Sequence, residues 1–117
     1  MLKYVLLSLL AMICAVGLLV NTATADPADN NFTSNEMTGN GQQTTVTVTV
    51  DTTTATDWSL QKYNTTTSQW ETVQTGTTSS QTFTIACDNN LQNGVQYRVK
   101  GHTSAQSGPY KATATAS

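Results

Sequence analysis

Strict alternation of valine and threonine over residues 44–50 is the strongest pattern in the chain. Alternate side chains of a β-strand point to opposite faces, and β-branched residues favour the extended backbone. We therefore expect Val46, Val48 and Val50 to face a core while the intervening threonines face solvent. The pattern predicts a half-buried strand.

The same period of two recurs along the rest of the chain. It predicts five further strands, over residues 58–63, 70–75, 81–87, 94–102 and 110–116. The polar residues 64–69 separate the first two of these, which predicts a hairpin. Short strands at regular spacing, without a capped helical pattern between them, predict an all-β sandwich. The side chains expected in its core are Val48, Trp58, Leu60, Phe83, Ile85, Leu91, Tyr97 and Val99.

The turn and strand over residues 91–100 have the spacing of a tyrosine corner. Asn93 and Gly94 both tolerate the positive φ that a tight turn requires. In such a corner the tyrosine ring packs beneath the end of a sandwich and its hydroxyl returns to the backbone upstream. We therefore expect the hydroxyl of Tyr97 to meet the backbone near Leu91.

Residues 82–85 (TFTI) and 91–100 (LQNGVQYRVK) together resemble fibronectin type III and related immunoglobulin-like domains. The family pattern is a strand followed by Leu-x-Pro-Gly-x-x-Tyr-x-Val, and this chain has Asn93 at the proline position. The resemblance implies a single small immunoglobulin-like sandwich over residues 44–117. A first strand of the family type is not recognisable in the sequence.

The first 25 residues have the features of a secretory signal peptide. An apolar run from Val5 to Val20 precedes the cleavage pattern Ala23-Thr24-Ala25. We expect this segment to be a hydrophobic helix that contacts a membrane only during export. The alternative is a retained anchor, although the run is shorter than the roughly 20 residues that cross a bilayer. The remaining chain is predicted to be secreted and extracellular, or displayed at the cell surface.

Residues 26–43 are polar and rich in Asn and Gly, with Phe32 and Met37 as their only apolar anchors. We expect them to form a flexible arm or a short edge strand. Since a first strand is not recognisable, this arm could also add as a strand to a neighbouring copy. That hypothesis predicts self-association through residues 26–43.

Charge and cysteine content narrow the function classes. Only 10% of the residues are charged and the net charge is −2, so we expect no basic patch that would bind nucleic acid. Cys14 leaves with the signal peptide, and Cys87 is then the sole cysteine. Its sulfur shares the parity of Phe83 and Ile85, which predicts a core position, while an intermolecular disulfide is the alternative.

The sequence contains no residue set that demands a chemistry. His102 is the single histidine, and no sequence feature places a carboxylate or a nucleophile beside it. The sequence lacks the ligand spacings that are typical of zinc and calcium sites, so we expect neither a metal nor a cofactor. We also predict that the chain is not an enzyme. The residues most suited to contact a ligand are Tyr63 and Trp70, which flank a polar hairpin turn, and His102.

Three functions fit these observations. The first is a non-catalytic interaction module that binds an extracellular protein or polysaccharide through loops of the sandwich. Loops 52–57 and 103–108 are expected to cluster at one end for this purpose. The second is a structural subunit of an extracellular fibre or matrix that assembles by strand addition. The third is a small secreted enzyme inhibitor that presents a loop.

Overall fold

The computed structural model describes residues 29–117, and the predicted signal peptide lies outside this range. Its strands are β1 (Asn31–Ser34), β2 (Met37–Thr38), β3 (Thr45–Val50), β4 (Ala55–Asn64), β5 (Gln69–Thr77), β6 (Thr82–Ala86), β7 (Gln96–Thr103) and β8 (Tyr110–Ala116). The six strands predicted from alternation are all present as β3 to β8. Residues 29–117 contain no helix, and therefore none that is long and apolar enough to cross a bilayer.

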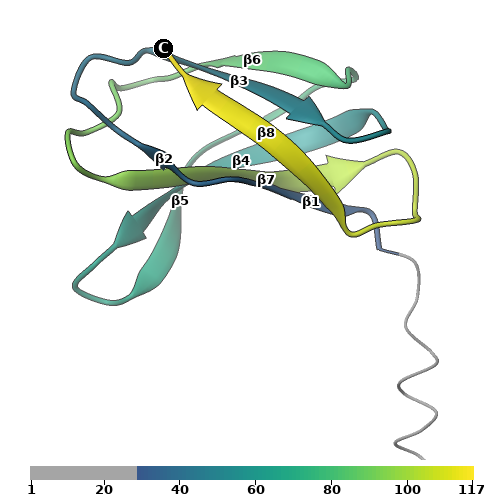
Figure 1. Cartoon of the computed structure of the whole chain (residues 1–117), viewed down its shortest axis with the longest axis horizontal. Coiled ribbons are helices and arrows are strands. Elements are labelled where there is room, and N and C mark those ends of the chain that lie inside the picture. The colour runs from purple at the N-terminus through teal and green to yellow at the C-terminus, as the bar shows by residue number, and fades with distance from the viewer. Residues whose placement is uncertain (1–28) are drawn as a thin grey trace, which may run out of the picture.

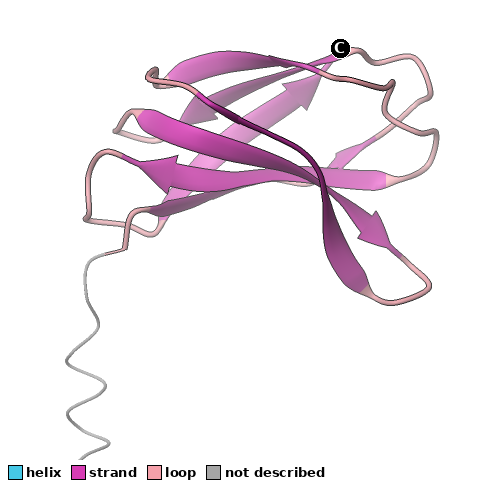
Figure 2. Cartoon of the chain, turned by 180° about the vertical axis from the view of Figure 1, so that it is seen from behind, coloured by secondary structure: helices cyan, strands magenta, loops and turns pink. Residues whose placement is uncertain are grey.

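The strands form one hydrogen-bonded sheet that curls into two layers. Their order is β5-β4-β7-β1-β8-β3-β6, and β2 pairs with β7. The layer of β5, β4 and β7 lies beneath the layer of β8, β3 and β6 (Figure 1). From behind, the hairpin of β4 and β5 extends beyond the two layers (Figure 2). The all-β sandwich predicted from the sequence is confirmed.

β1 lies inside the sheet, where sequence analysis expected a flexible arm or an edge strand. It pairs antiparallel with β7 and parallel with β8, so both of its edges are hydrogen-bonded. Phe32 is fully buried between the layers, and its ring meets Phe83 of β6 edge to face at 6.4 Å. The chain thus supplies its own first strand, which removes the reason for expecting strand addition to a neighbour.

The strand order differs from that of an immunoglobulin-like domain. In that fold the last strand lies beside the strand that carries the tyrosine corner. Here β1 occupies the place beside β7, and the last strand, β8, pairs with β3 and β1. The fibronectin type III resemblance therefore extends to the sandwich and the corner but not to the pairing of the last strand.

The core contains seven of the eight predicted residues. Trp58 is the exception, because it is only partly buried and packs against the edge of the core. Its ring covers Gly76 of β5, where a Cβ atom would come within 2.6 Å of a ring carbon. Six further buried apolar residues complete the core, namely Phe32, Met37, Val46, Val50, Ala55 and Ala114. The two valines were expected from alternation, whereas Phe32 and Met37 come from the segment expected to be an arm.

Candidate functional site

The side chains that alternate with the core residues of β4, β5 and β7 share the solvent side of this layer, which we call the outer face. The register places Tyr63 opposite Trp70, and Gln61 opposite Arg98. The outer face includes Asp57, Ser59, Gln61 and Tyr63 of β4, Trp70, Thr72, Thr75 and Thr77 of β5, and Arg98, Lys100 and His102 of β7. It brings together all three candidate ligand residues, with the aromatic pair and His102 at opposite ends.

An aromatic pair forms one end of the outer face. The rings of Tyr63 and Trp70 meet edge to face, with centroids 5.2 Å apart and planes at 62°. Both side chains are partly buried. The hairpin turn beside them is fixed by Asn64, whose side-chain oxygen accepts hydrogen bonds from the backbone N–H groups of Thr66 and Thr67. The pair therefore has a fixed place on the sheet and still presents aromatic surface to solvent.

Arg98 joins the aromatic pair to the polar centre of the face. Its guanidinium carbon lies 4.2 Å from the centroid of the Trp70 ring, and its Nε donates a hydrogen bond to Oε1 of Gln61 at 2.8 Å. Both partners are neutral, so they orient the guanidinium without cancelling its charge. Sequence analysis did not select Arg98, because an outward-pointing residue of a strand carries no local signal of a site.

His102 and Asp57 form a hydrogen-bonded pair at the other end of the outer face. Nδ1 of His102 lies 2.9 Å from Oδ1 and 3.1 Å from Oδ2 of Asp57. The backbone N–H of His102 donates to the same Oδ1 at 3.0 Å. The two side chains are 52% and 44% exposed, so the pair adds little to the stability of the fold. A carboxylate only accepts hydrogen bonds, so Nδ1 of His102 is the donor in this contact.

A shallow hollow of about 230 Å³ lies beside the pair of His102 and Asp57. It is lined by Asn31, Asp57, Ser59, Gln61, Lys100, Gly101 and His102. A hydrolytic triad needs a hydroxyl hydrogen-bonded to the free imidazole nitrogen. No residue in the described part of the chain makes that bond to Nε2 of His102. The groups that line the hollow are amide, hydroxyl, carboxylate, ammonium and imidazole.

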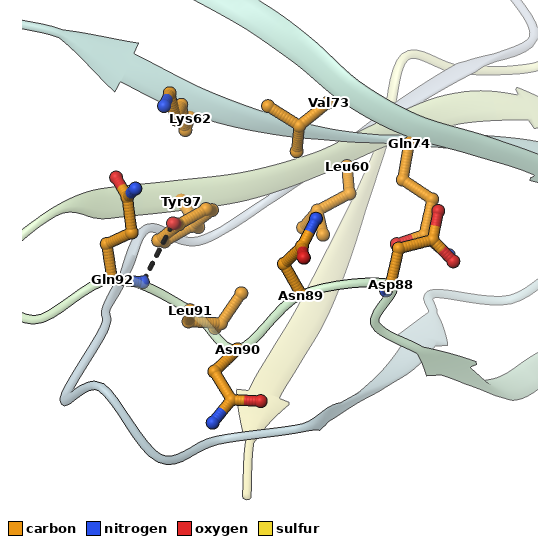
Figure 3. A pocket seen from close by; sticks show the side chains of 10 residues that line it. All are labelled: Leu60, Lys62, Val73, Gln74, Asp88, Asn89, Asn90, Leu91, Gln92 and Tyr97. Atoms are coloured by element: carbon orange, nitrogen blue, oxygen red, sulfur yellow. Dashed lines mark hydrogen bonds between the residues drawn. The ribbon is translucent and has the colours of Figure 1, made fainter.

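A second hollow, of about 160 Å³, lies on the opposite side of the layer, between β5 and residues 88–92 (Figure 3). Leu60, Leu91 and Tyr97 lie at its buried side, and Val73 lines it while remaining 46% exposed. The hydroxyl of Tyr97 accepts a hydrogen bond from the backbone N–H of Gln92 at 2.9 Å. The predicted tyrosine corner is thus confirmed.

Removal of this hydroxyl is expected to lower stability moderately. Tyr97→Phe keeps the ring and leaves the N–H of Gln92 without its partner, so we expect a loss of about 1 kcal/mol in the free energy of unfolding. Urea denaturation followed by tryptophan fluorescence measures it. Tyr110→Phe removes another hydroxyl that accepts a backbone N–H, that of Ser107 in an exposed loop, and should cost less. Equal stability of Tyr97→Phe and the parent protein contradicts the role of the corner.

Cys87 lies at the edge of the core, as its strand parity predicted, and is partly buried against it. Burial raises the pKa of the Cys87 thiol, and the negative charge of Asp88 adds to the effect. The thiolate is therefore disfavoured near neutral pH, which slows disulfide exchange. Within residues 29–117, no group of three or more histidine, cysteine or carboxylate side chains is placed to hold a metal ion.

Loops 52–57 and 103–108, which were expected to bind a ligand, lie side by side. The backbone N–H of Ser104 donates to the carbonyl of Thr54 at 2.9 Å, which joins the two loops at one end of the sandwich. Residues 52–54 and 104–108 carry only small or neutral polar side chains. The aromatic and cationic groups lie instead on the outer face of the sheet, so the structure favours this face over the loops as the candidate site.

A comparison with solved structures found a structural match. No family model and no curated protein matches the sequence. The fold is similar to the solved structure of the family 32 carbohydrate-binding module of C. perfringens NanJ in complex with galactose, at 12% identity and a TM-score of 0.42. The match covers 70% of this chain and 59% of that module. A likeness at this level assigns neither a family nor a ligand.

Proposed function

We propose that this chain is a secreted, non-catalytic module that binds a polysaccharide on its outer face. The observation that carries the proposal is the grouping of Trp70, Tyr63 and Arg98 beside the amide of Gln61 on one exposed sheet surface. The apolar C–H faces of sugar rings pack on aromatic rings, and sugar hydroxyls exchange hydrogen bonds with amide and charged groups. An aromatic ring beside fixed polar groups meets both requirements.

The shape of the outer face suits an extended chain better than a small molecule. The row of side chains on β4 runs from Asp57 to Tyr63, about 20 Å at the rise of an antiparallel strand. The hollow at one end is shallow, and the aromatic pair at the other end is only partly buried. Small-molecule sites are enclosed instead, because they bury most of their ligand. A polymer that lies along the sheet can contact both ends together.

Replacement of Trp70 tests the proposal. Trp70→Ala removes the largest aromatic surface of the face, and we expect the association constant for a bound polysaccharide to fall about tenfold. This corresponds to about 1.4 kcal/mol, near the upper end for one aromatic contact. Affinity electrophoresis in gels that contain single polysaccharides measures the change and identifies which polymers bind.

Val73→Ala is the matched control, because Val73 is an exposed apolar residue of the same strand that lines the second hollow instead. We expect this variant to bind like the parent protein. A thermal melt of each variant separates lost binding from lost folding. Retention of full affinity in a folded Trp70→Ala variant, for every polymer that the parent protein binds, contradicts the site.

A further inference from the structure

The outer face carries a net positive charge on a chain that is negative as a whole. Arg98, Lys100 and His102 follow one another at every second position of β7, and Asp57 is the one carboxylate of the face. The formal net charge of the chain is −2. In the described part of the chain Asp57 pairs with His102, while neither Arg98 nor Lys100 has a carboxylate partner. We propose that the outer face takes an acidic polysaccharide whose sugars carry carboxylates, a polyuronate; this inference rests on the function proposed above.

Arg98 has the geometry of a carboxylate receptor. Its Nε is bound to Gln61, and its flat guanidinium is held over the Trp70 ring. The two terminal nitrogens make no hydrogen bond to other residues of the described part of the chain. A guanidinium binds a carboxylate through two parallel N–H donors, and one that is already oriented loses less side-chain entropy on binding. A uronate that binds here also lies beside the aromatic surface of Trp70.

Lys100 supplies the second cation, inside the shallow hollow. The side chains of Ser59 and Gln61 line the same hollow, so an ammonium lies beside hydroxyl and amide groups that suit the ring hydroxyls of a sugar. Lys100 and Arg98 are separated by one residue, which puts their Cα atoms about 6.8 Å apart along the strand. Two cations in line along β7 match a polymer with a carboxylate on each sugar better than they match a neutral chain.

Asp57 would repel an acidic polymer, but hydrogen bonds from His102 fix the position of its carboxylate. Nδ1 of His102 contacts both carboxylate oxygens, at 2.9 and 3.1 Å. The backbone N–H of His102 binds Oδ1 as well. These donors turn the carboxylate of Asp57 toward β7, and the two cations Arg98 and Lys100 outnumber this one carboxylate on the outer face. Arg98 lies farther from Asp57 along β7 than Lys100 does.

The test compares two soluble polymers that differ only in charge, namely a homopolymer of galacturonic acid and the same polymer with its carboxyl groups reduced to alcohols. Isothermal titration calorimetry gives the association constants. We expect the parent protein to prefer the acidic polymer by about tenfold or more, and Arg98→Gln and Lys100→Gln each to lower that affinity about tenfold. Lys62→Gln is the matched control, because Lys62 lines the second hollow on the opposite side of the sheet. It makes the same charge change, and we expect its affinity to stay near that of the parent protein.

The outcomes separate this inference from the proposed function. The preference for uronates is wrong if the parent protein binds both polymers with equal affinity and Arg98→Gln and Lys100→Gln keep that affinity. If Trp70→Ala loses the affinity in the same experiment, the proposed binding site is still supported. Equal losses in Lys62→Gln and Lys100→Gln also overturn the preference for uronates, because attraction would then follow overall charge. A sulfated neutral polymer that binds as tightly as the polyuronate overturns the assignment to carboxylates. If no polysaccharide binds in the affinity gels, the proposed function fails as well.

Discussion

Phe32→Ala is expected to destabilise the protein by about 3–5 kcal/mol, the cost of truncating a buried phenylalanine in a packed core. Phe32 has no exposed surface, and its ring contacts Phe83 across the two layers. Small domains have about 5–15 kcal/mol of stability in total, so this variant should approach complete unfolding at moderate temperature. Guanidinium denaturation at 25 °C measures the change.

The control for this prediction is again Val73→Ala, which shortens a 46% exposed side chain. We expect a loss below about 0.5 kcal/mol there. Phe32→Leu keeps most of the apolar volume, so its loss of stability should lie between those of Phe32→Ala and Val73→Ala. A loss of less than 1 kcal/mol in Phe32→Ala contradicts the interior position of β1 and restores the interpretation of this segment as a dispensable arm.

Gly101→Ala is expected to cost about 3 kcal/mol, at the upper end for overpacking a core. Gly101 pairs with Phe32 across β7 and β1, and the phenylalanine ring covers it. An added Cβ would meet the carbonyl oxygen of Asp57 and would come within 2.6 Å of the Phe32 ring. The carbonyl belongs to the backbone of β4, so it cannot turn aside as a side chain can.

A double-mutant cycle between these two positions isolates the contact. Phe32→Ala removes one of the two obstacles to a Cβ at position 101 and leaves the carbonyl of Asp57. Gly101→Ala should therefore cost less in the Phe32→Ala background than in the parent protein, with a coupling free energy of about 1 kcal/mol. Additive losses in the double variant would show that the ring does not rest on the glycine.

Local sequence patterns were sufficient to predict much of the fold. The alternation of Val46, Val48 and Val50 predicted β3 and its buried face, because the period of a strand is set by the backbone itself. The spacing of Leu91 and Tyr97 predicted the corner for a similar reason, since both partners of its hydrogen bond lie within a few residues of each other.

Features that depend on the pairing of distant segments could not be predicted. β1 has one apolar residue in its centre, too short a pattern to distinguish an interior strand from a loop, and its partners β7 and β8 are at the far end of the chain. Asp57 faces His102 because β4 pairs with β7 in a register that shifts between Ala55 and Asp57. A bulge of this kind changes which side chains meet and leaves no mark on the hydrophobic pattern.

The place of β1 between β7 and β8 sets the order in which the chain can fold. β1 precedes the other described strands in the sequence, and both of its partners, β7 and β8, follow all the rest. Pairing between segments so distant in sequence makes folding slow. A nascent chain therefore cannot complete its core until β7 and β8 have both been synthesised.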